Sequence, residues 1–273
     1  MHSRNDIGAL LSEHGLAPRR DLGQNFVVDA NIVRKVARLA GVGPGDHVVE
    51  IGAGLGSLTM ALAETGATIT AIEVDHGVAA VLRTVVADLS NVTVVEADAL
   101  RLDWKATMAA APRWALVANL PYNVATPLVC DLLDFVPSVQ RMLVMVQREV
   151  AERLCAAAGS EAYGAVSVKV AYWATARIAA TVPASVFVPR PKVESALADI
   201  HRRPSPAVDV APEPLFQLVR TAFGQRRKML RRSLAAVVAP EVFDAAGIDA
   251  QRRPEELDIA EWGALTTAWL AAT

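Results

Sequence analysis

The sequence predicts an α/β fold, in which a doubly wound, mostly parallel sheet is followed by a small all-helical C-terminal domain. Between residues 46 and 158, short apolar runs typical of buried strands alternate with segments whose apolar residues have helical spacing. This alternation indicates right-handed crossover connections and parallel strand pairing. A stretch with four prolines, residues 201–214, then separates this region from a remainder with helical character.

The individual elements follow in order along the chain. The first strand is predicted at 46–54, where an apolar run ends in glycine, and the helix after it, 57–66, stops at Gly66. The following elements are strands at 67–75, 91–100, 114–122 and 140–147, and helices at 77–89, 126–136 and 148–158. Two closing strands, 176–182 and 195–203, have no long helix between them, which predicts an antiparallel pair at one edge of the sheet.

Length and composition support two domains in one soluble chain. We expect a first domain over residues 1–203, a Pro-rich linker over 204–214 and a helical second domain over 215–273. Apolar residues make up 53% and charged residues 21%, as in ordinary globular proteins. No run approaches the roughly 18 apolar residues of a membrane helix, and no signal-type segment follows the N-terminus. We therefore expect a cytoplasmic protein that does not interact with membranes.

Cysteine and histidine usage gives no sign of a metal site. Cys130 and Cys155 lie far apart, outside any metal or redox spacing, and the five histidines form no ligand pattern. The two cysteines are expected to be small core residues of a reduced protein. We expect no bound metal.

Unusual polar residues follow several of the predicted strands. In a parallel sheet, ligands bind beyond the carboxyl ends of the strands, where the strand order reverses. The first strand leads into a loop containing Gly52 and Gly54, which would allow the backbone to approach a ligand closely. The second ends in Glu73, 19 residues after Gly54, the third in Asp98 and the fourth in Asn119. These residues predict a nucleotide-like ligand on one rim of the sheet.

The glycine loop favours S-adenosyl-L-methionine over a dinucleotide. Its pattern is G-x-G-x-G, and Ser57 stands where the third glycine of the dinucleotide fingerprint belongs. A glycine loop followed by acids that end the second and third strands fits a ligand without a pyrophosphate. In this interpretation Glu73 accepts hydrogen bonds from the ribose and Asp98 from the adenine amino group. A methyltransferase is favoured over a dehydrogenase.

The stretch W-A-L-V-A-N-L-P-Y at 114–122 suggests the reaction. The lone pair of an adenine N6 amine is delocalised into the ring, which makes the amine a poor nucleophile. The Asn119 side-chain carbonyl and the Leu120 backbone carbonyl could accept the amine hydrogens and favour a more tetrahedral nitrogen. Pro121 stiffens the turn, and Tyr122 offers an aromatic face for a flipped base. Positioning and electrostatics would supply most of the rate.

These motifs together resemble the ribosomal RNA adenine N6-dimethyltransferases, and within them the KsgA-type enzymes of the small subunit. The resemblance runs from about residue 20 to the C-terminus, and its motifs are L-G-Q-N-F-V-V-D (22–29), N-L-P-Y (119–122), Q-R-E-V-A-E-R-L (147–154), V-F-V-P-R-P-K-V-E-S-A-L (186–197) and A-F-G-Q-R-R-K-M-L-R-R-S-L (222–234). It implies a Rossmann-like class I methyltransferase sheet. It also implies dimethylation of two adjacent adenosines near the 3′ end of 16S rRNA in the immature 30S subunit, by a protein we expect to be monomeric.

The resemblance also adds residues to the site. It implies that Asn25 and the backbone of Val27 bind the cofactor, and that Phe187 grips the target adenine together with Tyr122. Three positions depart from the family pattern. Ala53 and Ala125 are small replacements for Pro and Ser. Ala165 takes the place of a frequent Arg and removes one RNA contact that the family pattern would provide.

A basic cluster on the second domain is the predicted RNA-binding surface. The net charge of −2 argues against a uniformly basic nucleic-acid binder, but residues 215–232 contain six cations and no acid. The cations are Arg220, Arg226, Arg227, Lys228, Arg231 and Arg232. A solvated helix face is the simpler interpretation of such a cluster. The resemblance favours contacts with rRNA phosphates.

Two other functions remain open at this point. One is an Erm-type enzyme, which methylates 23S rRNA and shares the N-L-P-Y signature. The long Pro-rich linker and the motifs at 187–196 and 225–234 favour the KsgA type. The other is a non-catalytic RNA-binding assembly factor of the same fold, against which the intact cofactor rim argues.

Overall fold

The computed structural model describes all 273 residues and divides them into two compact units. The first unit comprises Met1–Ala151 and Arg177–His201, and the second comprises Glu152–Ala176 and Arg202–Thr273. The predicted end of the first domain at residue 203 lies two residues from this division, but residues 152–176, which were predicted to belong to the first domain, fold with the second unit. None of the helices combines the length and the apolar composition needed to cross a membrane.

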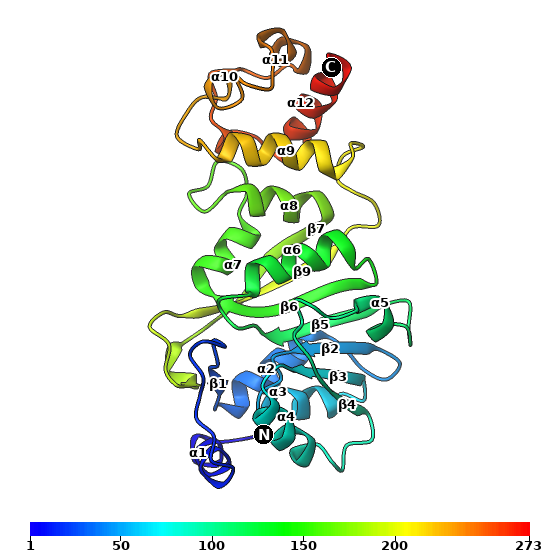
Figure 1. Ribbon diagram of the computed structural model, residues 1–273, viewed down its shortest axis with the longest axis vertical. Coiled ribbons are helices and arrows are strands. Elements are labelled where there is room, and N and C mark those ends of the chain that lie inside the picture. The colour runs from blue at the N-terminus through cyan, green and yellow to red at the C-terminus, as the bar shows by residue number, and fades with distance from the viewer. The chain divides into compact units, whose positions relative to one another are not determined.

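A seven-stranded sheet forms the centre of the first unit (Figure 1). In spatial order its strands are β4 (Val92–Glu96), β3 (Thr68–Glu73), β2 (His47–Ile51), β5 (Trp114–Asn119), β6 (Val139–Gln147), β9 (Ser195–Arg202) and β7 (Ala174–Val182). The pairs from β4 to β6 are parallel, and β9 runs antiparallel to β6. The two closing strands are neighbours at one edge of the sheet, as predicted. The α/β fold class is confirmed.

The central strands are buried on both faces, which explains their continuous apolar sequences. Val48 and Val49 of β2 and Leu116 and Ala118 of β5 have no exposed surface. The helices of this unit are α1 (Arg4–Glu13), α2 (Ala30–Ala40), α3 (Ser57–Ala63), α4 (His76–Val85), α5 (Trp104–Thr107), α6 (Ala125–Phe135) and the start of α7 (Arg148–Cys155). Since β3 and β5 lie on opposite sides of β2, the strand order reverses between β2 and β5, where an open α/β sheet binds its ligand.

A small second sheet holds the N-terminal segment in place. It pairs β1 (Phe26–Val27) with β8 (Phe187–Val188), which follows the 3₁₀ turn Ala184–Val186. The pairing joins residues about 160 positions apart in the sequence. No local pattern in the sequence indicates it.

The second unit is helical and has its own apolar core. Its helices are α8 (Ala165–Trp173), α9 (Pro212–Phe223), α10 (Leu230–Ser233), α11 (Pro240–Ala246) and α12 (Ile259–Ala271), with a 3₁₀ turn at Pro254–Glu256. Helix α9 buries Leu215, Leu218, Val219 and Ala222, at the spacing of one helical face. It begins at Pro212, within the predicted linker, because proline is well tolerated in the first turn of a helix. Helix α8 is not among the predicted elements.

Candidate active site

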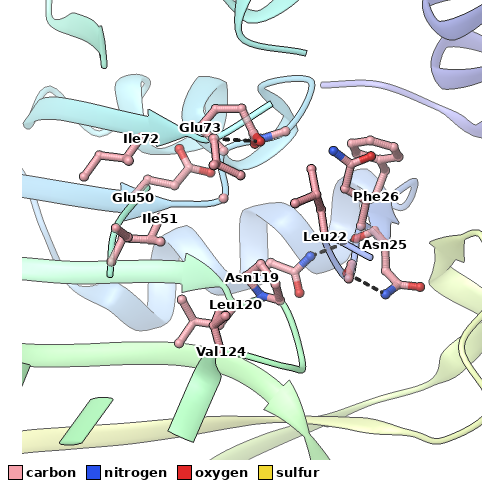
Figure 2. Close-up of a pocket in the computed structure, with 18 of the residues that line it drawn as sticks. Leu22, Asn25, Phe26, Glu50, Ile51, Ile72, Glu73, Asn119, Leu120 and Val124 are labelled. Carbon is pink, nitrogen blue, oxygen red and sulfur yellow. Dashed lines mark hydrogen bonds between the residues drawn. The ribbon is translucent and has the colours of Figure 1, made fainter. Parts of the chain in front are cut away.

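A cavity of about 220 Å³ opens at the carboxyl ends of β2, β3 and β5 in the first unit. All the residues predicted to bind the cofactor line this cavity, and they are Asn25, Val27, Gly52, Gly54, Glu73, Asp98 and Asn119. Figure 2 shows Glu50, Glu73 and Asn119 at the strand ends and Leu22, Asn25 and Phe26 facing them. The pocket therefore has one wall from the sheet and one from the N-terminal segment.

The glycine loop after β2 needs its glycines. Gly52 and Gly54 have φ angles of 71° and 59°, in the left-handed region that side chains disfavour. A Cβ on Gly54 would lie 3.1 Å from the Phe26 ring. The loop is tied to β3 by N–H groups of Gly52 and Ala53, which both donate to the Ile72 carbonyl. The pocket floor is thus bare backbone that a ligand can approach closely.

Glu73 ends β3 and is held by three backbone hydrogen bonds. Its Oε1 accepts from the N–H groups of Val74 and Asp75, and its Oε2 accepts from that of Gly54 at 2.8 Å. The side chain is only 4% exposed, and burial raises its pKa although the three hydrogen bonds oppose the rise. Since each carboxylate oxygen can accept two hydrogen bonds, Oε2 keeps one lone pair for a hydroxyl group of the ligand.

Replacing Glu73 by alanine is expected to weaken S-adenosyl-L-methionine binding by about 1–3 kcal/mol, the cost of a lost hydrogen bond to a charged group. Glu96 gives a matched control, because it pairs with Glu73 in the strand register but bonds to His76 and Arg83 outside the pocket. Calorimetric titration of the Glu73→Ala and Glu96→Ala variants, with thermal unfolding in parallel, measures the effect. An unchanged dissociation constant for Glu73→Ala would show that Glu73 does not bind the ribose.

Asp98 lies beyond the strand end at which it was predicted. Strand β4 stops at Glu96, so Asp98 belongs to the following loop, where its Oδ1 accepts from the Leu100 N–H at 3.0 Å. Its Oδ2 lies 3.7 Å from the Arg101 Nε. The side chain remains partly exposed in the pocket, where it can accept a further hydrogen bond.

The Asn119 side chain is oriented by a hydrogen bond that joins the end of β5 to the N-terminal segment. Its Nδ2 donates to the Asn25 carbonyl at 2.9 Å, while the Asn25 side chain donates to the Gly23 carbonyl. With its Nδ2 engaged in this way, Asn119 lines the pocket with its Oδ1 atom left to accept a hydrogen bond. Leu120, next in the chain, donates its N–H to the Met145 carbonyl and is buried.

The two predicted base-binding rings lie in different environments. Tyr122 is partly exposed, lines the pocket and has its hydroxyl 2.9 Å from the Ser195 Oγ. Phe187 does not line the pocket and has no exposed surface, because its pairing with Val27 places the ring in the hydrophobic core. This packing does not support the predicted role of Phe187, because the ring offers no exposed face on which a base could stack.

Several residues of the pocket were not predicted from the sequence, and they include three polar residues and one residue from a distant helix. Glu50 is 1% exposed and accepts from the Thr59 hydroxyl at 2.6 Å, and burial raises its pKa to about 8, so its carboxyl group is largely protonated at neutral pH. The Nε2 of Gln24 and the Oγ of Ser57 are buried there without a hydrogen-bond partner. Ile7 of α1 completes the wall. The E-x-G-x-G pattern was the available signal for Glu50, while nothing in the sequence places Ile7.

A family model described as "Ribosomal RNA adenine dimethylase" matches residues 15–269. The chain belongs to the ribosomal RNA adenine dimethylase family. A relative from Kineococcus radiotolerans, named "Ribosomal RNA small subunit methyltransferase A", is 46% identical over 269 residues, which cover 95% of this chain and 89% of the relative.

Solved structures of low sequence identity share the fold. A dimethyladenosine transferase from Plasmodium falciparum is 22% identical, with a TM-score of 0.76, and the match covers 88% of this chain and 95% of that one. The 23S rRNA methyltransferase ErmE is 24% identical, with a TM-score of 0.71 and coverage of 89% and 98%. At this identity both similarities establish the fold and do not distinguish between substrates.

The predicted RNA-binding cations of this adenine dimethylase family member lie in the second unit. All six are exposed, on the end of α9, on the loop after it and on α10. Arg226 differs from the others, because its Nε donates to Glu255 at 2.8 Å and its Nη2 to the Glu161 carbonyl. Its charge is already paired, so the remaining cations, Arg220, Arg227, Lys228, Arg231 and Arg232, are the better candidates for phosphate contacts.

Proposed function

We propose that this chain transfers methyl groups from S-adenosyl-L-methionine to the N6 atoms of two adjacent adenosines near the 3′ end of 16S rRNA, in the immature 30S subunit. The observation that carries the proposal is the Asn119 Oδ1, which is held as an acceptor at the end of β5 within a chain of this family. The name of the 46% identical relative supports a small-subunit substrate over 23S rRNA. Action on ribosomal RNA also supports a cytoplasmic location, and we expect the protein to act as a monomer.

The residues of the pocket fit this cofactor. The glycine loop leaves space that a Cβ would fill, and Glu73 keeps one acceptor position for a ribose hydroxyl. The unpartnered Gln24 Nε2 and Ser57 Oγ can donate to a carboxylate such as that of the methionine part. When bound, S-adenosyl-L-methionine supplies an electrophilic methyl group on a sulfonium.

The chain's own part in the reaction is to present the amine. The Asn119 Oδ1 and the Leu120 carbonyl would accept the two amine hydrogens, while the ring of Tyr122 stacks on the base. Methyl transfer to the amine nitrogen would break the carbon–sulfur bond of the cofactor, and the extra proton of the amine would pass to water. Glu50 is not placed to act as the general base, because its side chain is buried and accepts a hydrogen bond from the Thr59 hydroxyl.

The proposed RNA contacts predict a change in salt dependence. Changing Arg227 and Lys228 together to glutamine is expected to lower affinity for an undermethylated 30S particle and to flatten its salt dependence by about one unit of slope for each lost phosphate contact. Arg226→Gln is the control, since Arg226 is engaged by Glu255. Filter binding at several salt concentrations measures both effects. Equal slopes for the double variant and the unchanged protein would exclude this surface.

Incorporation of labelled methyl groups tests the proposed function directly. Undermethylated 30S particles should be labelled and yield N6,N6-dimethyladenosine on nucleoside mass analysis, whereas 50S particles and protein-free 23S rRNA should be poor acceptors. Preferential labelling of 23S rRNA would indicate the Erm-type activity instead. Binding of 30S particles without cofactor binding or methyl transfer would indicate a non-catalytic assembly factor.

A further inference from the structure

We propose that Ser195 is a positioning residue that holds the ring of Tyr122 in place for the target base. The proposal rests on the proposed function, in which Tyr122 stacks on the flipped adenine. The Ser195 Oγ lies 2.9 Å from the Tyr122 hydroxyl, and Ser195 has no exposed surface. A hydrogen bond to a buried serine hydroxyl would fix the far end of the partly exposed tyrosine ring, whose face must stay open to the base.

The two residues come from strands that are not neighbours. Strand β6 lies between β5 and β9, and the register pairs Asn119 with Met145 and Gln147 with Ser195. Tyr122 stands three residues beyond the end of β5, on the turn formed by Leu120 and Pro121. The hydroxyl pair therefore spans the end of β6 and ties the turn to the first residue of β9.

Ser195 is the rigid member of the pair. Its backbone is registered against Gln147, and the adjacent Glu194 carbonyl accepts from the Arg148 N–H at 3.0 Å. The Arg148 and Glu194 side chains also form an ion pair at 3.2 Å. Tyr122 lies on a turn, and burial raises its pKa, so its hydroxyl stays protonated at neutral pH and can donate as well as accept. Loss of the serine hydroxyl would leave the tyrosine ring free to adopt other orientations.

A double-mutant cycle on the full-length protein tests the coupling. Ser195→Ala and Tyr122→Phe should each lower the single-turnover rate of methyl transfer to 30S particles roughly three- to tenfold, the range expected for one neutral hydrogen bond. The double variant should be no slower than either single variant, because both changes remove the same bond. Affinity for S-adenosyl-L-methionine should stay unchanged, and Ser195→Thr, which keeps a hydroxyl, should recover the rate.

Control variants separate positioning from general loss of structure. Tyr172→Phe and Ser233→Ala remove hydrogen bonds to the Val210 and Leu230 carbonyls in the second unit. Their effect on thermal unfolding can be compared with that of Ser195→Ala, but their transfer rates should not fall. Multiplicative effects in the double variant, or a matching loss of cofactor affinity in Ser195→Ala, would overturn the proposal.

A measurement that does not depend on methyl transfer can test the role of Ser195 separately from the proposed function. The chain has three tyrosines, so the ring signals in a tyrosine-labelled NMR spectrum can be assigned with Tyr122→Phe. Ser195→Ala should shift the Tyr122 signal and leave those of Tyr163 and Tyr172 in place. An unmoved Tyr122 signal would overturn the role of Ser195, whereas failure of the unchanged protein to methylate any ribosomal RNA would overturn the proposed function itself.

Discussion

Replacing Asn119 by alanine is expected to slow methyl transfer by about 10²–10³-fold, the usual effect of losing one preorganised polar group at the reacting centre. The loss should be large because the Nδ2–Asn25 bond fixes the acceptor before the substrate arrives. Without the Oδ1 atom, the amine would keep its planar, delocalised form. Single-turnover transfer to undermethylated 30S particles at saturating cofactor is the measurement.

Asn91 offers a control for the loss of a structural asparagine. The Asn91 Nδ2 donates to the Ala63 and Ala67 carbonyls, and Asn91 does not line the pocket. Asn91→Ala should lower stability but leave the transfer rate intact once the protein is folded. Normal turnover by Asn119→Ala would mean that the residue only ends its strand.

Replacing Asp199 by alanine is expected to destabilise the first unit by about 3 kcal/mol. Asp199 is 1% exposed, and its carboxylate lies 3.0 Å from Arg141 Nε, 2.6 Å from Arg177 Nη2 and 2.9 Å from His201 Nε2. Arg141 also donates to the Leu39 and Ala40 carbonyls at the end of α2. The expected loss is at the lower end of the range for buried ion pairs, since Arg177 and His201 remain accessible to water.

The stabilisation that Asp199 provides is expected to be lost at low pH. Burial raises the pKa of Asp199, but the hydrogen bond and charge of Arg141 and the charges of His201 and Arg177 hold it below its usual value. A lowered pKa in the folded state means that the stabilisation is complete above the unfolded pKa of about 4 and is lost as the pH falls through the folded value. The difference between Asp199→Ala and the unchanged protein should therefore shrink at acid pH.

Hydrogen–deuterium exchange of β6 and β9 measures this local stability without assuming that both units unfold together. Glu194→Ala is the comparison, because its ion pair with Arg148 is half exposed and should contribute less than about 1 kcal/mol. Equal protection of β6 and β9 in the two variants would show that the Asp199 cluster contributes no more than a surface pair.

The strands were predictable because both faces of the sheet are covered, so that each strand is a continuous apolar run. Helix α8 was not, since the sequence A-V-S-V-K-V-A-Y-W has no clear apolar face. The assignment of residues 152–176 to the first domain was wrong, because their place in the second unit depends on packing with α9 and α12, which no local pattern indicates.

The site was predictable where it follows strand ends, as at Glu73 and Asn119. It was not predictable where distant segments meet. The burial of Phe187 depends on pairing with Val27, and the contribution of Ile7 depends on where α1 packs. The engagement of Arg226 by Glu255 is likewise a tertiary contact between segments 29 residues apart. Charge counting along the sequence treats all six cations of that cluster alike.

The division of the chain restricts how the protein can be shortened. Its four segments, residues 1–151, 152–176, 177–201 and 202–273, alternate between the units, so the backbone passes between them three times. A protein ending at residue 203 would keep α8 but lose α9 and α12, leaving Val168 and Tyr172 without most of their core. To obtain the first unit alone, residues 152–176 would have to be replaced by a short bridge. During synthesis, β7 and β9 emerge only after α8, so the central sheet is completed after part of the helical unit has already left the ribosome.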